Sequence, residues 1–430
     1  MNDTLYLGFS YKLLYLRFQF MFIESLAKKT LGFKSFIVDK VHWRGDGLLI
    51  EVIPRKRSRP VCGICGSRRS HYDTLSPRRW RHVNLWGIET FIVYSPRRVK
   101  CPACGIRVER IPWSMGKSRL SLPLISVLQT LARHISWDGV ARLYGVCWNT
   151  VRAAVQASVE YGLANRQIEG VVYIGVDEIA RRKGHRYVTN IYDLTDKRLL
   201  ATAPGRDELS LYKCFQEIGK SLMSKPLVIC CDMWKPYLKT IRENLHPDTV
   251  VVLDRFHIVR NLLAAVDEVR REEYHDKKKS NPGLLKRTRY LWLKNPENLK
   301  PAEKQRLSEL EKLNLKASRA YLLKESLREL WEYKNKNQAV RFLDKWFWWA
   351  THSRLKPMRN LAWSLKKHEE KILNWFDHPI NNGLVEGLNG KAKAVMRRAY
   401  GYRTFDTLRL ALLHNLGKLP EPNYSTHRFL

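Results

Sequence analysis

The sequence predicts an α/β core that is interrupted by a helical insertion and preceded by two small domains. Two apolar, β-branched runs, residues 171–178 and 225–232, end in acidic side chains, as buried strands do when they carry functional groups to the edge of a sheet. Residues 256–375 are strongly charged and have a helical pattern almost throughout. Two Cys-x2-Cys pairs lie upstream of the first run. At 430 residues, the chain is long enough for two to four domains.

The charge balance favours nucleic acid as the partner. Lysine and arginine number 77 against 41 acidic residues, which gives a formal net charge of +36, and 11% of the residues are aromatic. Such a composition is typical of nucleic-acid-binding proteins, although a membrane surface or ribosomal RNA would also attract this charge. Lys12 and Arg17 interrupt the apolar N-terminus, so we expect neither a signal peptide nor a membrane span. Met21 is an alternative natural first residue.

The N-terminal part predicts a hairpin followed by a zinc ribbon. Residues 1–54 are expected to form an extension and a short β hairpin, with strands over 36–43 and 48–53. Residues 55–116 hold both cysteine pairs, each followed by a glycine that lets backbone amides turn toward the sulfur atoms. We expect one structural Zn²⁺ ion, and the alternative is a pair of reduced surface turns. The predicted ligands are Cys62, Cys65, Cys101 and Cys104.

The cysteine usage is that of a metal site and not of a disulfide framework, because the other four cysteines are single or adjacent. This predicts a reducing, cytoplasmic location. Between the pairs, the basic stretch 76–86 contains tryptophans and would suit phosphate contact, although zinc ribbons also dock onto proteins.

Residues 117–168 predict a helix-turn-helix domain. Three helical patterns follow one another, and Gly145 falls in a tight turn between the last two. The recognition helix would span residues 148–156, with Asn149, Thr150 and Arg152 facing the major groove of double-stranded DNA. An ordinary three-helix linker bundle is the alternative.

The core then follows a recognisable order of elements. After the strand that ends at Asp177 and Glu178, we expect strands over 185–194 and 197–203, a helix over 207–221, the strand that ends at Asp232, a helix over 234–244 and a strand over 249–254. The order β-β-β-α-β-α-β is that of the ribonuclease-H-like fold. Asp177 and Asp232 would lie at the carboxyl ends of their strands, where ligands bind to open α/β sheets.

The core would have two parts, residues 169–258 and 376–415, separated by a helical insertion over 259–375, with a tail over 416–430. Tryptophans gather at 346–349 of the insertion, and Trp331, Trp363 and Trp375 are near in sequence. They could stack on extruded bases, but at helical spacing the core interpretation is favoured.

The second part of the core carries a polar helical stripe. Glu386, Asn389, Lys393 and Arg397 recur on one face, while Leu384, Leu388, Ala392 and Val395 form the other. Such a stripe can be a solvated face, but its place between 381–383 and the segment 400–403 favours a function.

Three acids on separate elements, Asp177, Asp232 and Glu386, can hold two divalent ions for in-line phosphoryl transfer. Asp254 is the main rival for the second position because it also ends a strand. Asp232 is preferred because its strand is expected to neighbour that of Asp177. Asp254 and His257 would organise the core or the scissile phosphate, and Glu178 and Asn389 would support the ligands.

These motifs together resemble the ISL3 family of bacterial insertion-sequence transposases. The match comprises the four-cysteine ribbon, the pattern G-V-x-W-x-T-V in the helix-turn-helix, G-V-D-E at Asp177, C-D-M-W-x-x-Y at Asp232, L-D-R-F-H ending at His257, and N-G-x-V-E-G-x-N-x-x-x-K around Glu386 with G-Y-R after it. It covers nearly everything from about residue 21 to about residue 415.

The resemblance implies a DDE transposase that moves a short element. Asp177 would bridge two Mg²⁺ (or Mn²⁺) ions, and Asp232 and Glu386 would hold one each, with Lys393 and Arg397 close to the DNA. The implied partners are the terminal inverted repeats and the target DNA, together with at least a second copy of the chain. The implied location is the bacterial cytoplasm, at the nucleoid. The alternatives are a DNA-binding regulator with an inactive nuclease core and a structure-specific nuclease or resolvase.

Overall fold

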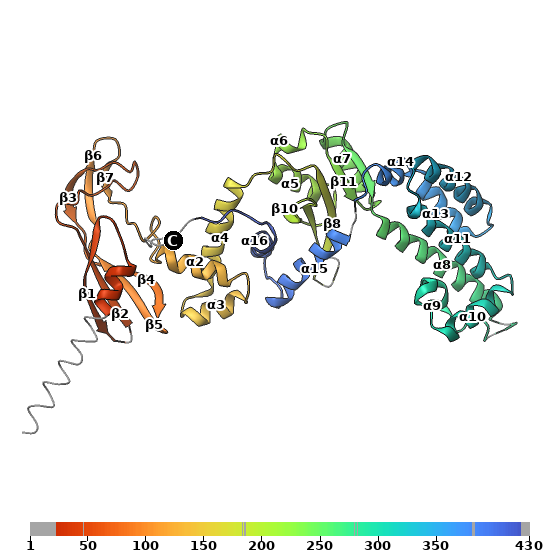
Figure 1. Cartoon of the computed structure of the whole chain (residues 1–430), viewed down its shortest axis with the longest axis horizontal. Coiled ribbons are helices and arrows are strands. Elements are labelled where there is room, and N and C mark those ends of the chain that lie inside the picture. Colours follow the sequence, from red (N-terminus) through yellow and green to blue (C-terminus); the bar gives the residue numbers. More distant parts are fainter. Residues whose placement is uncertain are drawn as a thin grey trace, which may run out of the picture. The chain divides into compact units, whose positions relative to one another are not determined.

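The computed structural model describes residues 23–45, 47–182, 184, 186–278, 280–281, 283–380 and 383–422. The chain divides into two compact units, one formed by Met1–Arg166 with Leu419–Leu430 and the other by Gln167–Lys418 (Figure 1). The expectation about Met21 lies outside the described residues, as do Asn381 and Asn382 of the last motif.

The first unit begins with a helix over residues 23–30, which is followed by a four-stranded sheet in the order β1-β2-β5-β4. The predicted hairpin is present, with β1 and β2 antiparallel, and β2 also pairs with β5 in parallel. The sheet therefore joins strands from both sides of the expected boundary at residue 54. The bounds are β1 Phe36–Arg44, β2 Gly47–Pro54, β4 Arg78–Leu85 and β5 Ile88–Tyr94.

The core of this sheet surrounds Trp113, whose ring packs edge-on against Phe36, Trp80 and Tyr94. Trp80 is only 4% exposed. The expectation that the tryptophans of stretch 76–86 contact phosphate is therefore wrong for Trp80, because alternation along β4 turns this side chain into the core. Trp86, in the turn after β4, is 67% exposed.

A second, three-stranded antiparallel sheet in the order β3-β6-β7 carries the cysteine pairs. Three helices follow, and Gly145, with φ of 60°, ends α3 in the left-handed conformation that the tight turn requires. Ser121 and Ser136 cap the first two of these helices. The bounds are β3 Ser70–Thr74, β6 Arg97–Cys101, β7 Gly105–Val108, α2 Leu122–Leu131, α3 Trp137–Tyr144 and α4 Trp148–Asn165.

The second unit is built on a five-stranded sheet in the order β10-β9-β8-β11-β12. The first three strands form an antiparallel meander, and β11 and β12 continue the sheet in parallel with β8. This is the expected order of strands and helices. The bounds are β8 Tyr173–Arg182, β9 Arg186–Asp193, β10 Arg198–Pro204, β11 Val228–Cys231, β12 Val250–Leu253, α5 Glu208–Ile218, α6 Lys220–Met223 and α7 Lys235–Asn244.

Two sequence expectations about these elements need correction. Asp177 and Glu178 do not end their strand, because β8 continues to Arg182 by pairing with β9. The helix expected over 207–221 is divided at Gly219, whose φ is 105°.

The helical insertion has a core of its own. Helix α8 starts directly after Asp254 and continues into the insertion without a break, so no boundary exists at residue 259. Of its tryptophans, Trp331 and Trp346 are buried, whereas Trp348, Trp349 and Trp363 are exposed, so the core interpretation holds for only part of the cluster. The helices are α8 Arg255–Lys277, α9 Arg289–Leu293, α10 Pro301–Glu311, α11 Lys316–Arg328, α12 Lys336–His352, α13 Lys356–Lys366 and α14 Glu369–Leu373, with short 3-10 turns at Pro296–Asn298, Glu329–Glu332 and Asn374–Phe376.

The chain then returns to the sheet through α15 (Gly383–Arg398) and α16 (Phe405–Leu416). Helix α15 approaches β8 closely at Gly175, where an added Cβ would lie 2.5 Å from Val385 Cγ2. Val385, Leu388, Ala392 and Val395 are buried on the sheet side of α15. Within the described residues, no helix combines the length and the apolar character that a bilayer crossing requires.

Candidate metal centres and nucleic-acid interface

A cavity of about 590 Å³ lies at the end of the sheet where β11 and β12 stop. Asp177, Glu178 and Asp254 line it from the strand side, and Glu386 and Lys393 line it from α15. Glu386 follows Asp254 by 386 − 254 = 132 positions in the sequence, and α15 brings the two sides together by packing on β8.

The register of the parallel strands explains why three aspartates lie at one edge. Cys230 pairs with Gly175 on β8, and Cys231 pairs with Leu253 on β12. Asp232 directly follows β11, so this register places it level with Asp254 on one side and with Asp177 on the other. Asp232 does not itself line the cavity, but its charge repels those of Asp177 and Glu178.

Asn389 fixes the position of Asp177. Its Nδ2 donates a 2.7 Å hydrogen bond to Asp177 Oδ2, and its Oδ1 accepts a 2.7 Å bond from the Tyr192 hydroxyl. Asn389 is 4% exposed. The amide therefore joins α15 to β8 and β9 through one buried side chain, and it holds the second carboxylate oxygen of Asp177 in one orientation.

Asp254 and His257 form a buried pair at the start of α8. Asp254 is 2% exposed, its Oδ1 caps the helix by accepting from Phe256 N at 2.8 Å, and its Oδ2 lies 2.5 Å from His257 Nδ1. Burial opposes protonation of His257, but the bond to Asp254 outweighs this effect and raises the pKa of the imidazole.

Burial and repulsion between neighbouring carboxylates disfavour the charged forms of the acidic side chains around the cavity. Burial raises the pKa of Asp177 and of Asp232 above the ordinary range of aspartate. Burial, followed by repulsion from Asp232 and Asp177, raises the pKa of Glu178 to about 7. A carboxyl group is stabilised in its charged form when a cation binds nearby, so this arrangement favours cation binding.

A second observation also indicates that the carboxylates around the cavity fit divalent cations. Glu178 Oε2 is buried and accepts no hydrogen bond from the described residues, which is costly unless another partner is supplied. Carboxylate oxygens are the ligands that Mg²⁺ and Mn²⁺ prefer. The acids are more widely spaced than a closed metal site, because among the described residues only the four cysteines place three or more potential ligand atoms all within 4.8 Å of one another.

Sequence reasoning missed several residues of this cavity. Arg206 and Arg260 line it, and Arg206 stacks on Tyr187 and Trp234 with its guanidinium carbon 4.4 Å and 5.4 Å from the ring centres. Arg260 lies one helical turn after His257, a spacing that could have revealed it. Arg397 does not line the cavity, although it was expected on the same stripe as Lys393. It lies exposed on the last turn of α15.

The four cysteines of the first unit form a compact cluster in which all sulfur atoms lie within 4.8 Å of one another. Gly66 and Gly105, the residues after each pair, have φ of 70° and 74°, as the expected turns toward sulfur require. Arg69 Nε donates to Cys101 Sγ at 3.4 Å. Hydrogen bonds from the backbone and side chain of Ser67 lower the pKa of Cys65 to about 6, which favours the thiolate that binds zinc.

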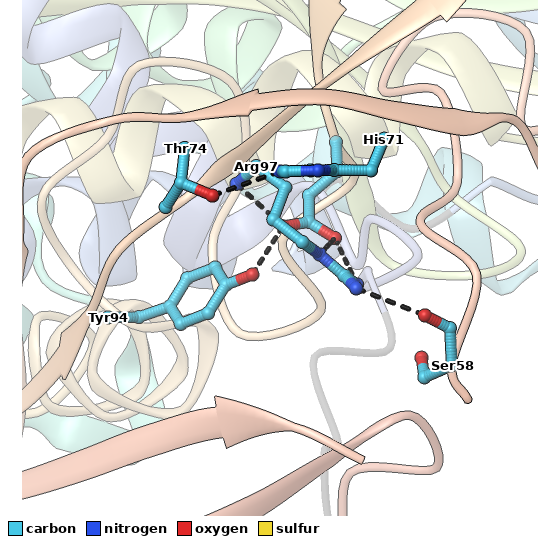
Figure 2. A network of polar contacts seen from close by, with 6 residues as sticks. Ser58, His71, Thr74, Tyr94 and Arg97 are labelled. Atoms are coloured by element: carbon cyan, nitrogen blue, oxygen red, sulfur yellow. Dashed lines mark hydrogen bonds and ion pairs between the residues drawn. The ribbon is translucent and has the colours of Figure 1, made fainter. Parts of the chain in front are cut away.

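A buried ion pair connects the cysteine-bearing sheet to the larger sheet. Glu109, which is 3% exposed, accepts from Arg97 Nη2 at 2.7 Å and from the hydroxyl of Tyr94 (Figure 2). Arg97 also donates to the carbonyl of Ser58 at 3.0 Å. The sequence pattern gave no sign of this pair, because its partners are brought together only by the pairing of β6 with β7.

The residues expected to read DNA lie on the first turns of α4. Asn149 is exposed, whereas Thr150 and Arg152 are half-buried. The Thr150 hydroxyl lies 3.0 Å from Cys147 Sγ at the start of the helix, and Arg152 Nη1 donates to Gln156 Oε1 at 3.2 Å. Val140, Val151 and Val155 fill the core between the helices, while Val146 is only half-buried.

Two family models and two transposases of known insertion sequences match this chain. Residues 174–412 match the ISL3 family model described as a transposase, and residues 58–104 match the model for the zinc finger of the transposases of IS204, IS1001, IS1096 and IS1165. The chain is 27% identical over 389 residues to the transposase for insertion sequence element IS1001 of Bordetella parapertussis, covering 89% of this chain and 96% of that protein. It is 30% identical over 405 residues to the transposase for IS1557 of Mycobacterium tuberculosis, covering 87% and 90%.

Proposed function

This chain belongs to the ISL3 family of transposases and carries its zinc ribbon, and from that premise we propose that it binds the ends of its own insertion sequence and catalyses metal-dependent cleavage and strand transfer of DNA. The observation that supports this most is the cavity shared by Asp177 and Glu386, with Asp232 directly after the adjacent strand β11.

We assign the five-stranded sheet with its meander and two parallel strands to the ribonuclease-H-like fold. In that assignment, the helical insertion separates Glu386 from the rest of the core. Asp177, Asp232 and Glu386 would hold two Mg²⁺ or Mn²⁺ ions, with Glu178 beside them. When bound, such ions activate the attacking oxygen and stabilise the leaving oxygen of an in-line displacement.

The chain's own side chains have separable tasks in this reaction. In cleavage, an oxygen of water bonds to the phosphorus and the 3′-oxygen leaves; in strand transfer, that freed 3′-hydroxyl attacks a phosphodiester of the target and expels another 3′-oxygen. Asn389 keeps Asp177 oriented, and the Asp254–His257 pair stabilises the start of α8. Lys393, Arg206 and Arg260 line the same cavity and would offset the charge that develops on the phosphate oxygens.

The first unit would bring the enzyme to its DNA. We propose that α3 and α4 act as a helix-turn-helix and that the zinc ribbon supports or extends this contact. The partners are then the double-stranded terminal inverted repeats and the target DNA. Two ends must be joined to one target, so the active assembly would contain at least two copies of the chain.

A cleavage and joining assay tests the proposal. Purified protein is incubated with DNA that carries the element's ends, in Mg²⁺ or Mn²⁺, beside the variant Glu386→Gln. Nicking at the ends followed by joining, both lost in the variant, is the expected result. Tight binding of the ends without a cut in either metal would favour a regulator with an inactive core. Cutting of branched DNA without regard to sequence would favour a resolvase.

A further inference from the structure

Tyr400 is displayed to solvent at a backbone position that disfavours it. It lies in the turn between α15 and α16, with φ of 52°, and its side chain is 101% exposed. Bulky residues rarely adopt the left-handed region, where Gly or Asn is tolerated at lower cost. The turn itself closes α15 through backbone bonds from Tyr400 N to Arg397 O and from Gly401 N to Met396 O, both 2.9 Å, but the fully exposed ring makes no packing contact within the chain. The ring is therefore explained better by a partner outside the chain.

The turn itself is firmly held. Tyr402, two residues later, is buried at 8% exposure and anchors the turn. Arg181 and Arg182 at the end of β8 donate to the carbonyl of Tyr402 at 3.1 Å and 2.9 Å. Arg181 also donates to the carbonyl of Arg403 at 3.0 Å. The backbone that carries the exposed Tyr400 ring is therefore held in place, which lowers the conformational entropy lost when a ligand stacks on the ring.

Several arginines lie around this turn, and within the described residues none of them forms an ion pair with an acidic side chain. They are five in number and lie at the turn and on the adjacent strands. The pKa of Arg181 is lowered by burial and by repulsion from Arg182 and Arg186. Like charges held together in this way favour a polyanionic partner. The five are Arg181, Arg182, Arg186, Arg397 and Arg403.

We propose that Tyr400 is a stacking platform for an unpaired base of the bound DNA and that the surrounding arginines hold the adjacent phosphates. Aromatic side chains between cations bind single-stranded nucleic acid in this way. This inference rests on the proposed function, because it assigns a contact on the same DNA substrate.

Two elements connect the turn to the acidic cavity and give the distance between them. From Asp177 to Arg182, β8 spans roughly 17 Å at about 3.3 Å per residue. From Glu386 to the turn, α15 spans roughly 20 Å at about 1.5 Å per residue. At about 3.4 Å per nucleotide along one strand, these distances of roughly 17 and 20 Å correspond to about five or six nucleotides of DNA. The unpaired base is therefore expected at about that distance from the phosphate being cleaved.

The test measures binding with Ca²⁺ in place of Mg²⁺, so that binding is read without cleavage. One end fragment is fully paired, and a second has three mismatched pairs centred five to six nucleotides from the cleavage point. Tyr400→Asn removes the ring and tolerates the left-handed backbone, and Tyr400→Phe keeps the ring. Tyr290→Asn is the matched control, because Tyr290 is also exposed, at 62%, but lies in the insertion.

We expect wild type, Tyr400→Phe and Tyr290→Asn to bind the mismatched fragment about tenfold more tightly than the paired one, and Tyr400→Asn to lose this preference. Thermal unfolding of Tyr400→Asn should be unchanged or shifted upward, which separates a binding defect from misfolding. Unchanged binding of Tyr400→Asn to both fragments, or an equal loss on both, would overturn the inference. If wild type bound neither fragment, the proposed function itself would fail.

Discussion

Asp232 and Asp254 follow adjacent parallel strands, yet their side chains are engaged differently. Both oxygens of Asp254 are occupied, by Phe256 N and by His257. Among the residues that the structure describes, Asp232 accepts one hydrogen bond, from Trp234 N at 2.9 Å. Asp232 therefore keeps more acceptor capacity for an ion than Asp254, although two bonds do not fill a carboxylate and Asp177 also accepts one bond at each oxygen. On this difference we propose Asp232 as the second metal ligand, although Asp254 and not Asp232 lines the cavity.

Replacing each aspartate by asparagine separates the two. Asp232→Asn should fold normally and lose roughly 10³-fold or more of the cleavage rate, as removal of a reacting group does. Asp254→Asn should lower the unfolding temperature and reduce the rate by about 10- to 100-fold, the effect typical of supporting residues. Cleavage rates and melting curves of both variants provide the check. A larger rate loss in Asp254→Asn would reverse the assignment.

Glu178 should make stability depend on pH. Its pKa rises from 4.5 to about 7 on folding, so the folded state holds a proton that the unfolded state has released. Stability therefore falls as pH increases from about 4.5 to 7 and then levels off. Glu178→Gln should raise the melting temperature by about 2–4 °C at pH 8, after allowance for solvent screening, and by much less at pH 5.

The measurement is thermal unfolding in buffer without added Mg²⁺. Glu243→Gln, an exposed carboxylate of the same unit, should give no pH-dependent difference. An increase for Glu178→Gln that is the same at both pH values would contradict the electrostatic explanation. Added Mg²⁺ should reduce the advantage of the variant if the acidic cavity binds the ion.

At the scale of elements, two helices determine the geometry of the cavity. Helix α8 begins at the cavity with the Asp254 cap and continues into the insertion, so the insertion has a rigid connection to the site. Helix α15 returns from the insertion and lies on β8, where Gly175 permits close approach. The positions of Glu386 and Asn389 depend on this contact.

Gly175→Ala should displace α15. The added Cβ would lie 2.5 Å from Val385 Cγ2 and 2.9 Å from Leu194 Cδ2, distances that force the neighbours to move. A shift of about 1 Å in α15 would weaken the bond from Asn389 to Asp177 and lower the cleavage rate about 100-fold. Val385→Ala in the same chain should restore part of the rate. Gly170→Ala, where no atom lies within 4 Å, is the control, and an equal effect there would contradict the packing argument.

At the scale of the whole molecule, the chain contains two compact units, one with the cysteine cluster and the three helices and the other with the acidic cavity. The two candidate metal centres therefore lie in different units and use different ligands, thiolates for zinc and carboxylates for Mg²⁺ or Mn²⁺. Their loss should have separable consequences.

Replacing Cys62 and Cys104 by serine should reduce the zinc content from about one ion per chain to nearly none, because half of the thiolates are lost. The first unit should unfold at lower temperature, whereas the unfolding of the second unit should be unaffected. Metal analysis together with calorimetry tests this. Unchanged zinc content would exclude the cluster as the site, and a joint loss of both transitions would show that the units do not unfold independently.

The sequence alone determined the elements whose signals are local. Spacing within short segments was enough to predict four features. These are the two cysteine pairs with their glycines, the hairpin at β1 and β2, the glycine turn at Gly145 and the order of strands in the second unit. Hydrophobic alternation and turn residues lie in the same short segment whose structure they determine. The candidate acids were found in this way as well, because Asp177 and Asp232 each end an apolar run and Glu386 lies on the polar stripe of a helical stretch.

Only the tertiary structure decided what depends on register and long-range packing. The pairing of β2 with β5 joined two segments that composition had separated, and the pairing of β8 with β9 carried the strand past Asp177. The sequence pattern could not show that Trp80 is buried and Trp348 exposed. In each stretch, several neighbouring residues fit the apolar positions of a strand or helix equally well. Arg206 and Arg260 reached the cavity, and Arg397 did not, because side-chain position at a site is fixed by the packing of distant elements and not by the residues next to it in sequence.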